Sequence, residues 1–190
     1  MGVAGGGGLT VLLGGARSGK SALAVRWAQG FDGPVAMLAT AEALDDEMRG
    51  RIARHRAERP AGWTTVEQPR DVPEALAAVD PGTFVIVDCL TLWVANLLDR
   101  SDADVLAAAD VLGRTAAARP APTVVVSNEV GWGIVPADAG SRRYRDLLGG
   151  VNRVVATHAV KAWLLVAGRV LALREPPGRP TEGTRSDEGR

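Results

Sequence analysis

One segment near the N-terminus restricts the possible folds of this chain more than any other. Residues 14–21 read GGARSGKS and match the phosphate-binding pattern G-x-x-x-x-G-K-[ST] at every fixed position. The apolar run at residues 9–13 precedes this segment and predicts a strand, and residues 22–28 follow it with the pattern of a helix. A strand, a glycine-rich turn and a helix start together form a cradle of backbone N–H groups for phosphate oxygens. The segment therefore predicts a phosphate-binding α/β fold.

The residues of the phosphate loop, residues 14–21, are expected to have different roles. We expect Lys20 to reach the β- and γ-phosphates of a nucleotide and Ser21 to hold a magnesium ion. The alternative is a glycine turn that binds an inorganic anion or nothing. Lys20 argues against it, because a lysine at a helix start opposes the helix dipole unless an anion is present. The loop residues expected to bind the nucleotide are Gly14, Gly15, Ala16, Arg17, Ser18, Gly19, Lys20 and Ser21.

The rest of the chain alternates short apolar runs with helical patterns. The expected strands cover residues 9–13, 35–39, 84–87, 123–127 and 163–167, with a weaker candidate at 170–173. The expected helices cover residues 20–29, 44–58, 72–79, 90–98, 104–118 and 142–160. The strands are continuously apolar, which is typical of a parallel sheet covered on both faces. We therefore predict an α/β fold like that of P-loop NTPases, with a mostly parallel central sheet and helices on both faces.

Length and composition predict one domain. The chain has 190 residues, with 22 basic and 22 acidic side chains, so no basic field suggests a nucleic-acid partner. We expect a flexible glycine-rich lead-in at residues 1–8, a single catalytic domain at 9–175 and a disordered polar tail at 176–190. Cys89 is the only cysteine, and the sequence shows neither a signal peptide nor a membrane span, which predicts a cytoplasmic protein.

A carboxylate at the end of an apolar strand is the second element of the predicted site. Asp88 follows the run at residues 84–87, and an Asp at the carboxyl end of such a strand lies beside the phosphate loop in nucleotide-hydrolysing folds. It is expected to bind Mg²⁺ together with Ser21. In the alternative interpretation, Asp88 caps the helix that starts near residue 90.

The charged segment at residues 45–60 contains His55. Acidic residues fill its first turn and arginines crowd its end, which complements a helix dipole. Met48, Ile52 and His55 are spaced at i, i+4 and i+7, so we expect them to share a packed face. Nearby arginines disfavour protonation of the imidazole, and a neutral imidazole is a nucleophile that could attack phosphorus. The residues alone favour a structural alternative, in which His55 bonds a carbonyl at the helix end.

A glycine-rich, partly polar segment at residues 127–136 follows another buried strand. Loops at the carboxyl ends of strands commonly contact substrate in open α/β sheets. Asn128 and Glu129 are candidate substrate residues here, with Glu129 as acceptor of a proton from a substrate hydroxyl. The alternative is a structural turn in which Asn128 bonds the backbone.

Several motifs in a fixed order resemble one family, the bifunctional adenosylcobinamide kinase / adenosylcobinamide-phosphate guanylyltransferases of cobalamin biosynthesis. The resemblance spans about residues 9–168 and is far more specific than the phosphate loop alone. It rests on residues 14–21, 39–41, 45–48, 51–52, 55–60, 63, 67, 87–94, 96–98 and 127–136.

The resemblance implies two reactions. A nucleoside triphosphate first phosphorylates the aminopropanol hydroxyl of adenosylcobinamide. GTP then guanylylates an enzyme histidine and releases pyrophosphate, and the GMP passes to adenosylcobinamide phosphate to give adenosylcobinamide-GDP. His55 resembles that histidine by position, which reverses the structural interpretation given above. The implied cofactors are GTP, or ATP as phosphoryl donor, and Mg²⁺.

The resemblance also implies nucleotide contacts outside the phosphate loop and a homotrimer. The chain departs from the family pattern at Val160 and Lys161, where acidic residues are frequent, and at Arg54, where some members have a second histidine. Two alternatives are a monofunctional P-loop kinase of small molecules and a non-catalytic GTP-binding regulator. The implied nucleotide contacts are Ala39, Thr40, Ala41, Arg56, Ala57, Glu58, Arg59, Glu67 and Asp88.

Overall fold

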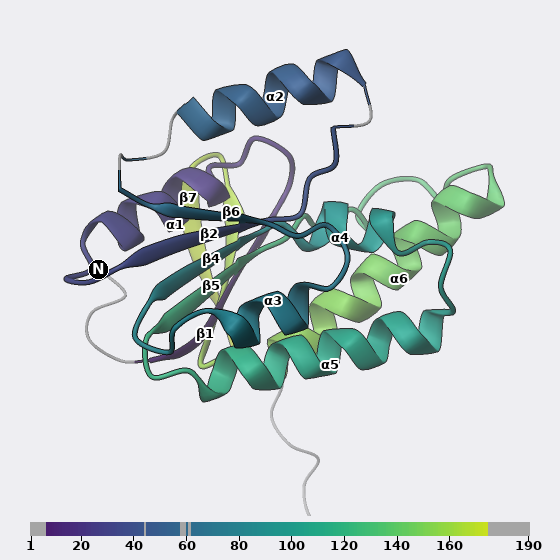
Figure 1. Cartoon of the computed structure of the whole chain (residues 1–190). Helices are drawn as coiled ribbons and strands as arrows, with labels where there is room; N and C mark the ends of the chain where they lie inside the picture. Colours follow the sequence, from purple (N-terminus) through teal and green to yellow (C-terminus); the bar gives the residue numbers. More distant parts are fainter. Residues whose placement is uncertain (1–6, 44, 58–59, 61, 175–190) are drawn as a thin grey trace, which may run out of the picture.

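A seven-stranded sheet organises the protein (Figure 1), with the strand order β3-β2-β4-β5-β1-β6-β7. The computed structural model describes residues 7–43, 45–57, 60 and 62–174. Neighbouring strands are parallel except β6 and β7, which are antiparallel. The predicted fold class is therefore confirmed. The strands are β1 (Gly8–Gly14), β2 (Val35–Ala39), β3 (Thr64–Glu67), β4 (Phe84–Asp88), β5 (Pro122–Val126), β6 (Lys161–Val166) and β7 (Arg169–Leu173).

Helices cover both faces of the sheet. Helix α1 (Lys20–Gln29) packs on one face, whereas α3 (Val72–Ala78), α4 (Leu90–Asn96), α5 (Asp102–Ala118) and α6 (Ala139–Ala156) form a layer on the other (Figure 1). Helix α2 (Asp46–Ala57) stands apart from these layers, above the sheet in the view of Figure 1. The phosphate-binding pattern and the apolar runs thus predicted the layers correctly.

The central strands are buried on both sides, which explains their continuous apolar runs. In β4, Phe84 and Ile86 belong to the core cluster that includes α1. Val85 and Val87 alternate with them and belong to the larger cluster under α3 to α6. Successive side chains of a strand point to opposite faces, so a sheet covered twice needs apolar residues at every position.

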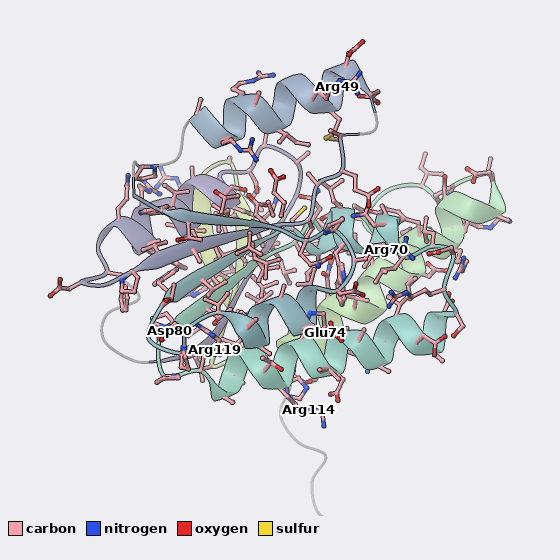
Figure 2. All side chains as sticks on the ribbon, viewed as in Figure 1. Arg49, Arg70, Glu74, Asp80, Arg114 and Arg119 are labelled. Carbon is pink, nitrogen blue, oxygen red and sulfur yellow. The ribbon has the colours of Figure 1, made fainter. Side chains whose placement is uncertain are left out.

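Arg119 joins α3, β4 and α5 at the edge of the sheet opposite the phosphate loop. The side chain is buried, and its guanidinium donates to main-chain oxygens that follow α3 and precede β4. Figure 2 shows it beside Asp80, while Arg114 lies on the outer side of α5. These oxygens belong to Val79, Asp80 and Thr83, and a further one belongs to Leu76 in the last turn of α3, at distances of 2.8 to 3.4 Å from the guanidinium nitrogens.

Two helices begin earlier than expected because of their capping residues. Ser101 accepts a hydrogen bond from the N–H of Asp104, and Asp138 accepts one from the N–H of Ser141, so α5 and α6 start at residues 102 and 139. Helix α6 also ends at Ala156, not at residue 160. The N–H of Val160 instead donates to the oxygen of Leu9 at 2.9 Å and so pairs with the sheet.

Strand β3 is the element that the sequence did not predict. Its four residues read TTVE and are half-buried or exposed at the sheet edge, so they lack the apolar run that marks the central strands. The weaker candidate at residues 170–173 is confirmed as part of β7. The expected lead-in and tail lie almost wholly outside the described residues, although Gly8 already belongs to β1. Among the described helices, none combines the length and the apolar character that crossing a bilayer requires.

Candidate functional site

The sequence-predicted site residues gather at the carboxyl edge of the sheet. Strand register places Glu67 of β3 opposite Ala39 of β2, and Ala39 opposite Asp88 of β4. Asp88 lies opposite Val126 of β5, two residues before Asn128. The phosphate loop follows β1 at the same edge. Parallel strands end on one side of a sheet, so the topology alone brings these segments together.

Backbone geometry shapes the phosphate loop and requires glycine at its first position. Gly14 has φ +146°, and a Cβ there would meet the oxygen of Leu165 at 2.3 Å. Gly19 has φ +101° and is the N-cap of α1, which has neither a side-chain cap nor an acidic residue in its first turn. The first N–H groups of α1 are therefore free of a competing side-chain cap, as an anion-binding helix start requires.

Lys20 lies at the floor of the phosphate loop. Its side chain is only 5% exposed, and Nζ donates to the oxygens of Gly14 at 2.8 Å and Gly15 at 2.7 Å. Burial lowers the pKa of Lys20, while the charges of Cys89 and Asp88 act in the opposite direction. Lys20 is thus bonded to main-chain oxygens of its own loop. Phosphate oxygens, being anionic, would make stronger, charge-assisted hydrogen bonds with Nζ and could take the place of these main-chain oxygens.

Asp88 and Ser21 supply oxygen donors of the kind that Mg²⁺ prefers. The Asp88 carboxylate makes no hydrogen bond with any described residue, and Cys89, not Asp88, is the N-cap of α4, so the capping alternative is wrong. In the described part of the chain, no three His, Cys, Asp or Glu side chains group to hold a metal. The residues present fit an ion held by one hydroxyl, one carboxylate, phosphate oxygens and water.

Thr40 forms the buried junction between β2 and α4. Its Oγ1 donates to the oxygen of Cys89 at 2.7 Å and accepts from the N–H of Cys89 at 2.8 Å. Asn96 Nδ2 donates to the oxygen of Thr40 at 2.8 Å. The Thr40 side chain is fully buried and committed to these bonds, whereas Ala39 and Ala41 on either side are half-buried at the edge.

Helix α2 is tied to the sheet edge by an ion pair. Arg56 donates through Nη2 to Oε1 of Glu67, at the end of β3. Met48 and Ile52 are only half-buried and no described side chain of α2 is fully buried, so the expected packed face is weaker than predicted. His55 belongs to α2, next to Arg56, but its side chain lies outside those described. Glu58 and Arg59 also lie outside the described residues, and Ala57 is exposed.

The segment after β5 is held against the phosphate loop. The N–H of Glu129 donates to the oxygen of Gly14 at 3.2 Å, and Oε1 of Glu129 accepts from the N–H of Gly131 at 2.9 Å. Thr91 Oγ1 accepts from the N–H of Asn128 at 2.9 Å, and Asn152 Nδ2 donates to the oxygen of Asn128 at 3.0 Å. The Asn128 side chain makes no hydrogen bond with a described residue, contrary to the structural-turn alternative.

The β6–β7 hairpin is a further neighbour of the phosphate loop, which the residue pattern alone does not predict. The N–H of Gly168 donates to the oxygen of Ser18 at 3.1 Å. Ala167 and Gly168 have φ +50° and +73° and form the tight turn. A small residue followed by Gly between two apolar runs is a hairpin signal, but its contact with residue 18 depends on the sheet order.

Comparisons with known proteins show the family to which the sequence is similar. The sequence model of a family described as "Cobinamide kinase / cobinamide phosphate guanyltransferase" matches residues 10–173. "Bifunctional adenosylcobalamin biosynthesis protein CobP" of Pseudomonas aeruginosa is 42% identical over 173 residues, covering 88% of this chain and 98% of that protein. "Bifunctional adenosylcobalamin biosynthesis protein CobU" of Escherichia coli is 39% identical over 178 residues, covering 84% of this chain and 96% of that protein.

Solved structures share the fold at low sequence identity. The RadB recombinase is similar with a TM-score of 0.51 and 19% identity, covering 84% of this chain and 74% of that chain. A likeness at this identity concerns the arrangement of strands and helices and not the chemistry.

Proposed function

This chain belongs to the cobinamide kinase / cobinamide phosphate guanyltransferase family, whose members are bifunctional enzymes, and from that premise we propose how its residues divide the two activities. The phosphate loop holds the nucleoside triphosphate in both reactions. His55 carries GMP from GTP to cobinamide phosphate. The observation that supports this division is the convergence of the phosphate loop, Asp88 and the Arg56–Glu67 pair at one sheet edge.

In the kinase reaction, the aminopropanol hydroxyl of adenosylcobinamide attacks the γ-phosphorus. The bond to the bridging oxygen breaks, and the nucleoside diphosphate leaves. Lys20 exchanges the oxygens of Gly14 and Gly15 for those of the β- and γ-phosphates, whose charge it offsets. Glu129, held beside Gly14, accepts the proton of the attacking hydroxyl, and Asn128 orients the substrate.

In the transferase reaction, a ring nitrogen of neutral His55 attacks the α-phosphorus of GTP. A phosphorus–nitrogen bond forms, the bond to the bridging oxygen breaks, and pyrophosphate leaves. A phosphate oxygen of adenosylcobinamide phosphate then attacks the same phosphorus. The phosphorus–nitrogen bond breaks, His55 is regenerated and adenosylcobinamide-GDP is released.

The cofactors and the assembly state complete the proposal. GTP is the guanylyl donor, and either ATP or GTP donates the phosphoryl group. Ser21 and Asp88 hold Mg²⁺, which, when bound, offsets the negative charge of the triphosphate. The nucleotide also contacts residues 39–41, 56–59 and 67. We further propose a homotrimer in the cytoplasm, on the basis of the family resemblance.

GTP labelled at the α-phosphate tests the transferase half. We expect acid-labile, alkali-stable labelling of the protein that disappears in His55→Ala, while phosphorylation of cobinamide continues. His158→Ala is the matched control, because His158 is the second of two histidines and bonds Asp110 far from the loop. An unlabelled wild-type protein would refute the covalent step.

The family's two activities argue against both alternatives drawn from the sequence. A monofunctional kinase predicts no protein-bound label, and a non-catalytic regulator predicts no change of mass in cobinamide incubated with GTP. Retention of the label in His55→Ala would assign the covalent step to another residue.

A further inference from the structure

The segment at residues 130–135 exposes an apolar surface beside the phosphate loop. It reads VGWGIV and carries no charged side chain. Trp132 is 73% exposed, Ile134 95% and Val135 61%. Exposed apolar side chains that follow one another along a short segment are unusual in a soluble domain and mark a binding surface.

Both ends of this segment, called here the apolar arch, are fixed to the body of the protein. At its start, the peptide groups of Asn128 are held from two helices, by Thr91 of α4 and Asn152 of α6. At its end, Arg142 Nη1 donates to the oxygen of Pro136 at 2.9 Å and to that of Ala137 at 2.6 Å. The arch therefore presents its side chains from two anchored ends, which reduces the entropy lost when a ligand binds.

The arch lies next to the place where phosphate is expected. Glu129, which immediately precedes it, donates through its N–H to Gly14 of the phosphate loop. Trp132 and Ile134 follow Glu129 by three and five residues, so a substrate that rests on them can extend toward the proposed base and the phosphate loop. An acceptor substrate must be held close to the nucleotide, because transfer requires the reacting atoms to approach within about 3–3.5 Å.

We propose that the apolar arch binds the corrin ring of the cobinamide substrate. This inference rests on the proposed function, which supplies the substrate. A corrin ring is broad and partly apolar, so exposed aromatic and aliphatic side chains offer it a surface on which to stack. Stacking on Trp132 buries the ring and leaves the polar aminopropanol arm free to reach Glu129 and the nucleotide.

A second copy of this chain is the main competing occupant of the arch. The edge strand β7 suits a second copy better, since all five of its residues are exposed and its outer backbone edge is unpaired by any described strand. The arch instead has no regular strand or helix to offer to a partner chain. Its position beside the phosphate loop favours a substrate.

Two substitutions test the arch in the full-length protein. Trp132→Ala and Ile134→Ala are expected to raise the KM for cobinamide in the kinase reaction by about tenfold each. The nucleotide KM and kcat should change by less than about twofold, because only substrate binding is weakened. Trp132→Phe should keep most of the wild-type affinity for cobinamide, because an aromatic ring remains at this position. Val160→Ala removes a side chain that is 67% exposed at the opposite sheet edge and serves as the control.

Two results would overturn the inference. One is an unchanged cobinamide KM in both alanine variants; the other is a change in oligomeric mass by size-exclusion chromatography with light scattering, which would assign the arch to a subunit contact. The α-phosphate labelling of the protein needs no cobinamide. If the alanine variants are labelled normally and their KM for cobinamide equals that of the wild type, only the corrin-binding role of the arch is refuted. If the wild type itself is not labelled, the transferase mechanism is refuted.

Discussion

The guanidinium of Arg56 donates a hydrogen bond to the carboxylate of Glu67 and thereby joins the end of α2 to the end of the edge strand β3. Both side chains are more than half exposed, at 58% and 54%, so the pair adds little to the free energy of folding. Its importance is positional. Helix α2 has no fully buried side chain among those described. The pair holds the C-terminal turn of α2 near the carboxyl end of the sheet, where the phosphate loop also lies.

Charge reversal at residues 56 and 67 tests whether the pair acts by positioning α2 or by contacting the nucleotide directly. Arg56→Glu or Glu67→Arg alone should slow guanylylation of the protein about tenfold or more, with unchanged melting temperature, because α2 loses its tether. The double variant should be labelled faster than either single variant, because the tether is restored with opposite polarity, but more slowly than the wild type, because the nucleotide contacts proposed for residues 56 and 67 remain lost. Asp46→Asn, which breaks the exposed pair with Arg49 at the other end of α2, is the control (Figure 2). A double variant as slow as the single ones would contradict a role for the tether and leave the proposed nucleotide contacts as the whole cause of the loss.

Lys20→Met should lower kcat/KM for phosphorylation and the rate of protein guanylylation by at least about 100-fold each, since both need the charge at the loop floor. Single-turnover assays over a range of nucleotide concentrations measure both losses. Loss of one activity with retention of the other would show that the two reactions do not share this lysine.

The same residue should also affect stability as a function of pH. Burial lowers the pKa of Lys20 from its ordinary value of 10.5, so the folded state releases this proton at a lower pH than the unfolded chain. The unfolded state then binds more protons, and the contribution of Lys20 to the free energy of unfolding rises as pH approaches 10.5. The free energy of unfolding of the wild type, measured in urea, should therefore increase relative to that of Lys20→Met as the pH rises. A relative decrease would contradict this prediction.

The thiol of Cys89 should react slowly with thiol reagents in the folded protein. Desolvation, with the nearby Asp88 charge, raises its pKa from 9.0 to about 11, so the reactive thiolate is about 100-fold scarcer at pH 8 than in an unperturbed cysteine. Because Cys89 is the only cysteine, labelling with a thiol-specific chromogenic reagent reports on it alone. Asp88→Asn should accelerate labelling by removing a negative charge, and the urea-unfolded chain should react at the ordinary rate. Rapid labelling of native wild type would contradict the desolvated environment.

The same pKa predicts a loss of stability in alkali. The folded state keeps the thiol proton to a higher pH than the unfolded chain, so the contribution of Cys89 is complete below pH 9 and is lost between pH 9 and about 11. Cys89→Ala should reduce this alkaline loss in urea unfolding. An equal loss in both proteins would exclude the thiol as its source.

Arg119→Met should destabilise the fold by about 3 kcal/mol, because it leaves buried main-chain oxygens without their donor. Arg114→Met is the control. Arg114 lies on α5 five residues before Arg119 and, among the described residues, forms only an exposed pair with Asp110, so its replacement should change stability by less than about 0.5 kcal/mol. Chemical denaturation measures both, and similar values for the two variants would contradict a structural role for Arg119.

The central part of the fold could be predicted from local patterns. The strands predicted at 35–39 and 84–87 and the helix predicted at 20–29 match β2, β4 and α1 to within one residue, because strand residues buried on both faces must be apolar at every position. Strand β3 could not be predicted in this way. It lies at an edge, only part of it is covered, and its four residues carry little hydrophobic signal. The capping residues Ser101 and Asp138 start α5 and α6 two and three residues before the predicted starts at 104 and 142.

The sequence by itself determined the chemistry that this protein can perform: a loop that binds phosphates, a carboxylate after an apolar strand and a histidine among arginines are recognisable by local residue type and spacing. Only the tertiary structure decided which of these residues meet. Register across β3, β2 and β4 places Glu67, Ala39 and Asp88 in one row, and the sheet order brings residues 18 and 168 into contact. Such pairings join segments distant in the chain, and they depend on how the whole sheet assembles, which no local pattern records.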